Sequence, residues 1–182
     1  MNILVTGGEG FIGKKLVNKL TKEGHNVTSL DLKSTADIVA DLSEPNFDFN
    51  CISNIDYIFH LAAQPGGYFS LDNPYTDGKW NCLGTINVVK LAQKLKVKKL
   101  IYTSSMAIYG NQEEASENLM GRNKPTPISF YGVSKFTGEL YTKLVYEHSG
   151  IPYTIFRLFA TYGSGQDLKN EQWVLEPYAD MV

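Results

Sequence analysis

Short apolar runs alternate with stretches of helical periodicity along most of the chain. Runs of apolar and β-branched residues predict strands over 3–5, 26–30, 36–40, 56–61, 99–103 and 153–159. Apolar positions at helical spacing predict helices over 11–22, 85–95 and 130–148. This alternation is typical of right-handed βαβ units, whose parallel strands are covered by helices on both faces. The predicted fold class is therefore α/β, with a doubly wound parallel sheet. The long connections 64–77 and 110–127 are expected to be functional or mobile loops.

The first predicted strand runs directly into a glycine cluster, Thr6-Gly7-Gly8-Glu9-Gly10-Phe11-Ile12-Gly13. The cluster fits both G-x-x-G-x-x-G and G-x-G-x-x-G. Glycine permits a tight turn and a close approach to a pyrophosphate, and the following helix offers unpaired N–H groups to the anion. Because the cluster lies between a strand and a helix, it predicts a dinucleotide-binding loop.

Two other interpretations of this cluster stay open. Gly8, Gly13 and Lys14 match the start of a P-loop, but that motif continues with Ser or Thr to hold Mg²⁺, and here Lys15 follows. The other interpretation is a glycine-rich turn without a ligand.

Acidic residues follow the second and third predicted strands. Asp31 comes 18 positions after Gly13 (31 − 13), about where an acidic residue binds a ribose 2′-hydroxyl. Its carboxylate would repel a 2′-phosphate, so NAD is favoured over NADP, although Lys33 stands nearby. Asp41, followed by Leu42, either holds the adenine edge or is a plain turn residue.

Tyr131 and Lys135 are four positions apart at the start of a predicted helix, so they project from one face. A tyrosine that acts as a base near neutrality needs its pKa lowered by roughly three units, about 4 kcal/mol. A neighbouring ammonium and a positive nicotinamide ring both favour the phenolate. Ser104 and Ser105 end the fifth predicted strand, where parallel strands face a ligand crevice. One serine is expected to bind a substrate hydroxyl, unless both only satisfy backbone groups.

Five motifs, in this order, resemble those of the extended short-chain dehydrogenase/reductase family. They are Thr6-Gly7-Gly8-x-Gly10-Phe11-Ile12-Gly13, His60-Leu61-Ala62-Ala63-Gln64, Asn81-x-x-Gly84-Thr85, Ser104-Ser105 with Tyr109-Gly110, and Tyr131-Gly132-x-Ser134-Lys135. More narrowly, they are similar to those of nucleotide-sugar epimerases and dehydratases, from residue 2 to about 167. The resemblance implies a Rossmann fold.

The resemblance also implies roles for particular residues. Tyr131 would be the base and acid, Lys135 would bind the nicotinamide ribose, Ser105 would bind the substrate hydroxyl, and Asn81 would support the site. The residues implied to surround NAD are Gly7, Gly10, Phe11, Ile12, Gly13, Asp31, Asp41, Leu42, Leu61, Ala62, Ala63, Tyr131 and Lys135.

Departures from the family pattern narrow the expected reaction. Dehydratases of the family carry Asp-Glu after the hydroxyl residue, but Met106 and Ala107 stand here and cannot exchange protons. Residues 60–74 are most similar to hexose and hexuronate 4-epimerases. The expected activity is therefore epimerisation of a UDP-hexose or UDP-hexuronate through a 4-keto intermediate. Ala160 stands where the family commonly has an Asn that touches the substrate diphosphate.

The chain is shorter than the family leads one to expect. Residues 1–167 are predicted to form the NAD-binding domain with the catalytic Tyr and Lys. Residues 168–182 would be a remnant or the start of a substrate-binding portion that is largely missing. Alternatives to an epimerase therefore stay open. The first is a catalytically incomplete NAD-binding module, and the weaker ones are a short-chain reductase acting on a small ketone and a nucleotide-sugar dehydratase.

Composition limits the remaining classes. With 17 Lys+Arg against 19 Asp+Glu, the net charge of −2 argues against binding to nucleic acid. No apolar run of 18 residues or signal peptide is visible, so we expect no membrane partner. Cys51 and Cys82 stand far apart, which favours a reducing compartment, the cytoplasm. The three histidines have no metal-ligand spacing, so no metal site is predicted.

The helix predicted over 130–148 carries more apolar residues than one contact with the sheet needs, which indicates contact with a partner protein. Phe136, Leu140, Leu144 and Val145 lie away from the expected catalytic residues. The favoured interpretation is a helical interface in a homodimer, and the alternative is burial under loops.

Overall fold

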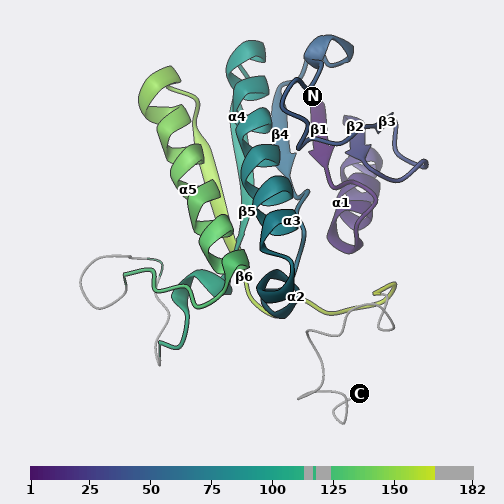
Figure 1. The fold of residues 1–182 in the computed structure, drawn as a ribbon. Helices are drawn as coiled ribbons and strands as arrows, with labels where there is room; N and C mark the ends of the chain where they lie inside the picture. Colours follow the sequence, from purple (N-terminus) through teal and green to yellow (C-terminus); the bar gives the residue numbers. More distant parts are fainter. Residues whose placement is uncertain (113–116, 118–123, 167–182) are drawn as a thin grey trace.

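The computed structural model describes residues 1–112, 117 and 124–166, and the stretch 168–182 lies outside this range (Figure 1). Six strands form one parallel sheet in the order β3-β2-β1-β4-β5-β6. Their bounds are β1 Asn2–Thr6, β2 Asn26–Asp31, β3 Ile38–Val39, β4 Tyr57–His60, β5 Lys99–Ser105 and β6 Tyr153–Leu158. The order reverses between β1 and β4, which is where open α/β sheets bind ligands at their carboxyl ends.

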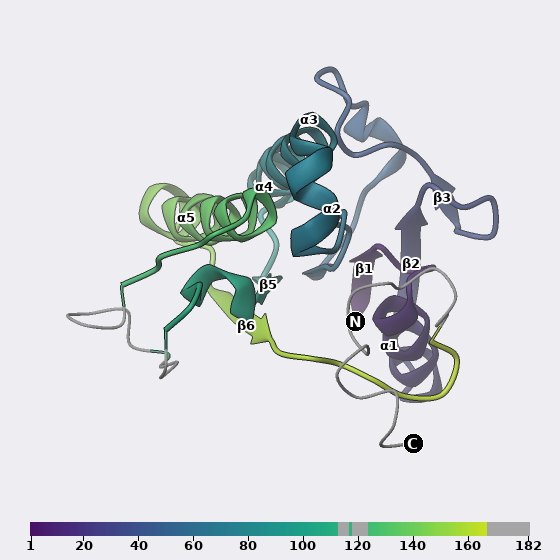
Figure 2. The ribbon, with the colours of Figure 1, turned by 60° about the horizontal axis from the view of Figure 1, so that its bottom comes forward.

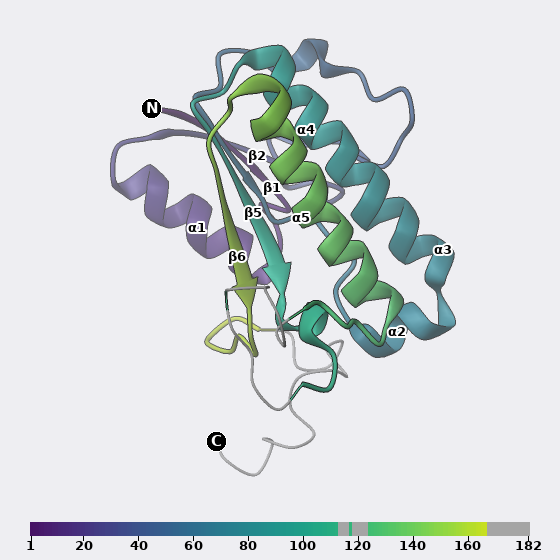
Figure 3. The ribbon, with the colours of Figure 1, turned by 90° about the vertical axis from the view of Figure 1, so that its left-hand side faces the viewer.

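Three long helices cover the two faces of the sheet. They are α1 (Phe11–Lys22), α4 (Gly84–Leu95) and α5 (Phe130–Ser149). Figure 3 shows α1 on one face and α4 and α5 on the other. The predicted doubly wound α/β fold is therefore confirmed. None of the helices in the described part of the chain is long and apolar enough to span a membrane.

The core lies between the sheet and α4. Apolar side chains of the central strands and of α4 form one buried cluster, which includes Leu4, Leu30, Ile58, Val88, Leu91, Ala92 and Leu100. Because both faces of the central strands are covered, their sequences are nearly continuous apolar runs rather than alternating ones.

The prediction of a long loop over 64–77 was wrong. This stretch contains α2 (Gly67–Asp72) and α3 (Pro74–Asp77), followed by the π-helical segment η2 (Gly78–Leu83). The backbone stays right-handed through Gly78, Leu83 and Gly84, so the helix that was expected to start at residue 85 runs on from Pro74. Proline suits the first helical position, but the glycines and the polar pattern hide this helix in the sequence.

Other elements differ from prediction in smaller ways. The strand predicted over 36–40 is reduced to β3, which pairs only with β2 at the edge of the sheet. Short 3₁₀ helices, η1 (Phe49–Cys51) and η3 (Met106–Tyr109), were not predicted. Val145 is buried in the core rather than lying on a free face of α5, because it packs with the cluster between α5 and α4.

A buried histidine joins β1, β4 and α4. The Thr85 hydroxyl donates to the carbonyl of Asn81 (2.6 Å), so its oxygen accepts from His60 Nε2 at 3.0 Å. His60 Nδ1 is then the acceptor for the Thr6 hydroxyl at 2.7 Å. Burial, with the charge of Lys135 as a smaller cause, lowers the pKa of His60 to about 3. The ring is therefore neutral in the folded chain.

This neutral histidine makes the fold sensitive to acid. An unfolded histidine binds a proton near pH 6.5, whereas folded His60 does so only near pH 3, so stability falls as the pH drops between these values. We expect His60 to account for a loss of about 2 kcal/mol of unfolding free energy between pH 7 and pH 5. Urea unfolding of His60→Asn at both pH values should show a smaller loss than the parent chain. The exposed His148, changed to Asn, is the matched control, and equal losses in all three proteins would contradict the prediction.

Candidate functional site

The glycine loop bends tightly over the carboxyl end of the sheet. Gly7 has a φ of +69°, and a Cβ added to it would lie 2.7 Å from the amide nitrogen of Ala62. Its own amide donates to the carbonyl of Leu30 at 2.8 Å, so the loop touches the ends of both β2 and β4. A side chain at Gly13 would collide with the Gly7 carbonyl. Only glycine fits these close approaches.

This loop leaves the start of α1 open to an anion. Gly10 is the N-cap of α1, and no side chain of the described residues caps the helix. No acidic residue stands in the first turn, so its N–H groups have no competing carboxylate. The observed cradle fits the pyrophosphate of a dinucleotide.

Most residues predicted to surround NAD lie together around this cradle. Phe11, Ile12 and Gly13 form the first turn of α1, and Asp31 is the last residue of β2. The segment 61–63 follows β4, where the Leu61 amide donates to the Thr6 carbonyl and the Ala62 amide donates to the Thr6 hydroxyl oxygen. Figure 2 shows the chain after β6 running across to α1, where Lys15 donates to the Ser164 carbonyl at 2.5 Å.

Asp41 and Leu42, which were also predicted to surround NAD, make other contacts in the structure. Asp41 Oδ1 accepts from the backbone and the hydroxyl of Ser43 at 2.8 and 2.5 Å, while Oδ2 lies 3.6 Å from the Lys79 ammonium. The Leu42 side chain is in the core, and its carbonyl accepts from Asn87. Asp41 is thus a turn residue in this structure, and contact of this pair with adenine stays a prediction.

The predicted catalytic residues meet at the ends of β5 and α5. Ser129 caps α5 by accepting from the Gly132 amide at 3.1 Å, so Tyr131 and Lys135 lie on the first two turns of the helix. The amide of Tyr131 donates to the hydroxyl of Ser70 in α2. Ser105 is the last residue of β5, and its hydroxyl lies near enough to the Tyr131 phenol to act on the pKa of that group. The structure therefore brings Ser105, Tyr131 and Lys135 to one place.

Asn81 fastens this group to the segment after β4. Its side chain exchanges hydrogen bonds with the backbone of Gln64 at 2.7 and 3.1 Å. Its amide nitrogen also reaches Asp77 Oδ2 at 2.8 Å and Ser134 Oγ at 3.1 Å. Asn81 stands in the π-helical segment, a geometry that is frequent at functional sites. Asn81 thus bonds to the residue next to Lys135, and its role in supporting the site stays a prediction.

Burial dominates the proton affinities of the site. It lowers the pKa of Lys135 to about 8, while the charges of Asp77 and Glu139 act in the opposite direction. Burial also raises the pKa of Tyr131, against the effect of the Ser105 hydroxyl and with help from Asp77. The downward shift expected for Tyr131 is therefore not produced by the side chains of this chain. The reason is that desolvation of the phenol outweighs them.

Sequence reasoning missed two buried acids beside Lys135. Asp77 is 1% exposed, and its Oδ1 has no hydrogen-bond partner among the described residues. Glu139, four residues after Lys135 and fully buried, forms a two-pronged ion pair with Arg157 at 2.8 and 2.9 Å. Arg157 also donates to the Tyr109 hydroxyl at 3.0 Å. Glu139 has a signal in the sequence, its spacing from Lys135, but Asp77 lies in the stretch that resembles a loop.

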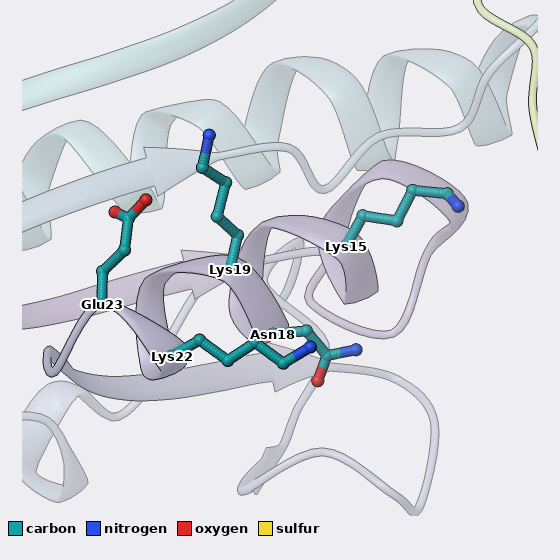
Figure 4. Close-up of a pocket in the computed structure, with 5 residues that line it drawn as sticks. All are labelled: Lys15, Asn18, Lys19, Lys22 and Glu23. Carbon is teal, nitrogen blue, oxygen red and sulfur yellow. The ribbon is translucent and has the colours of Figure 1, made fainter.

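A separate hollow lies against α1, away from these residues. It has a volume of about 440 Å³ and is lined by Lys15, Asn18, Lys19, Lys22 and Glu23 (Figure 4). These side chains project from α1 and the residue after it, and the hollow contains none of the predicted site residues. Within the described ranges, no three His, Cys, Asp or Glu side chains gather in a way that could hold a metal ion.

The fold and the site together define a class of protein. A doubly wound sheet with a glycine cradle, an acid at the end of β2 and a Ser, Tyr and Lys group at β5 and α5 is the arrangement of the extended short-chain dehydrogenases/reductases. The chain matches the NAD dependent epimerase/dehydratase family over residues 3–177, and it belongs to that family. This confirms the family resemblance and NAD as the cofactor.

Known relatives agree with this assignment. A putative UDP-glucose 4-epimerase of Methanocaldococcus jannaschii is 36% identical and covers 99% of this chain. A UDP-glucose 4-epimerase of Thermotoga maritima, solved with UDP-glucose, has a TM-score of 0.82 and 33% identity over 92% of this chain. A UDP-glucuronic acid 4-epimerase of Bacillus cereus, solved with NAD, has a TM-score of 0.77 and 30% identity over 91%. The chain spans only 62%, 58% and 59% of these three proteins.

The Glu139–Arg157 pair gives a prediction about stability. Changing Glu139 to Gln leaves the Arg157 guanidinium largely buried without its counter-charge, which should cost about 3–5 kcal/mol of unfolding free energy. Guanidinium unfolding measures the loss. Glu147→Gln, at an exposed position of the same helix, should change stability by less than about 0.5 kcal/mol. A similar small change in Glu139→Gln would show that the pair does not stabilise α5 on β6.

Proposed function

We propose that this chain is the NAD-binding part of a nucleotide-sugar 4-epimerase that acts on a UDP-hexose or UDP-hexuronate. The observation that carries the proposal is the placement of three residues at the same end of the sheet as the glycine cradle: Ser105 at the end of β5, and Tyr131 and buried Lys135 one helical turn apart at the start of α5. Residues 1–167 would form the cofactor domain, and 168–182 would begin the substrate-binding portion.

Binding and proton transfer fall to different parts of the site. The open first turn of α1 would hold the pyrophosphate, and Asp31 would accept from the adenosine ribose. Ser105 would orient the sugar 4-hydroxyl while Tyr131 Oη takes its proton and later returns it. The Lys135 ammonium, whose charge Asp77 and Glu139 favour, would bind the nicotinamide ribose. Because burial raises the pKa of Tyr131 in the chain alone, the phenolate would depend on the positive nicotinamide ring of bound NAD.

NAD, when bound, would supply hydride transfer in both directions, so the sugar would pass through a 4-keto form and no cofactor would be consumed. The residues after Ser105 support epimerisation over dehydration. Met106 and Ala107 begin η3 directly beside Ser105, and neither can exchange a proton with the sugar. Ala160 offers no side-chain amide to a substrate diphosphate, so that contact would come from elsewhere.

We further propose a homodimer formed through α5. Val133, Leu140 and Leu144 are 50%, 44% and 50% exposed and lie at spacings of seven and four residues, which places them on one stripe. A second copy would cover this stripe. The two cysteines, both free, suit a reducing compartment, so we place the protein in the cytoplasm.

Tyr131→Phe tests the catalytic assignment. The change removes the proton-transferring hydroxyl but keeps the ring, so turnover of UDP-sugars should fall by a factor of about 10²–10⁴ while NAD binding is preserved. NMR of UDP-glucose and UDP-glucuronate incubated with NAD and the chain measures turnover, and calorimetry measures binding. Tyr146→Phe, at an exposed position of the same helix, is the matched control and should keep full activity.

Other outcomes of that experiment separate the competing functions. NAD binding without conversion of any sugar by the parent chain would favour a cofactor-binding module. NADH consumed in proportion to a ketone product would favour a reductase. Substantial epimerisation by Tyr131→Phe would overturn the role given to the tyrosine.

A charge on the α5 stripe tests the dimer. Leu140→Glu should shift the chain from dimer to monomer in sedimentation velocity, because a carboxylate would be buried against its symmetry mate. Lys22→Glu on α1, on the opposite face of the sheet, should leave the dimer intact. A parent chain that sediments as a monomer at all concentrations would contradict the proposal.

A further inference from the structure

We propose that Glu9, the residue between Gly8 and Gly10, is a specificity-determining residue that excludes dinucleotides with a 2′-phosphate. Its carboxylate would add to that of Asp31 at the adenosine ribose and would keep Lys14 from attracting the phosphate. The inference rests on the proposed binding of NAD at the glycine cradle. The glycine motif itself leaves this position open to any residue.

Glu9 lies directly beside the carboxylate that is expected to bind the ribose. The amide of Glu9 donates to Asp31 Oδ2 at 3.0 Å, and the other oxygen of Asp31 accepts from the amide of Lys33 at 3.1 Å. The turn that carries Glu9 is thus bonded to the end of β2. A group attached at the ribose 2′ position would meet both acidic residues.

The Glu9 side chain is held in place rather than free in solvent. Its Oε2 accepts from the Thr35 hydroxyl at 2.5 Å and lies 3.5 Å from the Lys14 ammonium. The side chain is only 14% exposed, although it belongs to a surface loop. Two separate segments, the start of α1 and the stretch after β2, therefore keep the negative charge at this edge of the cradle.

Glu9 also limits how well the nearby lysines can bind a phosphate. Lys14 and Lys33 would otherwise favour a phosphate, since ammonium groups bind phosphate well. In this structure Lys14 pairs with the Glu9 carboxylate, and Lys33 donates to the Glu9 carbonyl at 3.1 Å. The Glu9 side chain thus engages Lys14, whereas the contact of Lys33 is with the main chain and does not depend on the side chain at position 9. Glu9 acts twice, through its own charge and through its pairing with Lys14.

The test compares the affinities of the full chain for NAD and NADP by calorimetry. Glu9→Gln keeps the size and hydrogen-bonding capacity of the side chain but removes its charge. We expect NADP affinity to rise about tenfold and NAD affinity to change less than about threefold. The gain should shrink at high salt, because the groups are partly exposed. Glu23→Gln, at the far end of α1, is the matched control and should leave both affinities unchanged.

A second variant separates the two effects of Glu9. In Glu9→Gln combined with Lys14→Gln, part of the gain in NADP affinity should disappear, because the released ammonium is gone. An unchanged NADP-to-NAD ratio in Glu9→Gln, with NAD still bound, would overturn this inference alone. A parent chain that binds neither dinucleotide would overturn the proposed function and this inference with it.

Discussion

The whole site depends on the close approach of the loop after β1 to the segment after β4. Gly7 sits where a Cβ would press on the backbone of Ala62, so the two strand ends come together only because that atom is absent. This contact opens the start of α1 toward the point where the strand order reverses. The same turn places Glu9 beside Asp31, because the Glu9 amide donates a hydrogen bond to the Asp31 carboxylate.

Behind that contact lies a buried polar network that links the cofactor half of the site to its catalytic half. His60 connects Thr6, which precedes the glycines, to Thr85 in α4. Thr85 donates to the carbonyl of Asn81, and Asn81 reaches Ser134, next to Lys135. Buried polar groups are costly unless they are paired, so such a network holds its members in one arrangement. A continuous set of hydrogen bonds therefore links the glycine cradle to the residue next to Lys135. Asp77 Oδ1, which has no hydrogen-bond partner in the part of the chain that the structure describes, belongs to a carboxylate bonded to Asn81 of this set.

Much of the fold could be predicted from the sequence, because the apolar residues of each long helix recur at helical spacing and the strands are short apolar runs. The helix over Phe11–Lys22 agrees with its prediction at both ends, and the one predicted over 130–148 extends by a single residue as α5. The continuous helix from Pro74 through η2 could not be predicted, because its polar residue Asn81 bonds to Gln64 and Ser134, which lie far away in the sequence, and such contacts leave no periodic apolar pattern. For the same reason Asp77 escaped notice as a member of the site.

By itself, the sequence determined the fold class, the family and the identity of the residues that meet at the carboxyl ends of the strands. These properties can be recognised locally, from short sequence motifs and from the spacing of apolar residues. Only the tertiary structure decided the charge state of the site and the surroundings of each group. The Tyr131 phenol was expected to acidify beside Lys135, yet its pKa is raised, since burial outweighs the neighbouring side chains. Glu9, a variable position in the motif, proved to be bonded to Asp31 and Thr35. Desolvation and such long-range contacts depend on what the folded chain packs around a residue, and the spacing of residues does not contain that information.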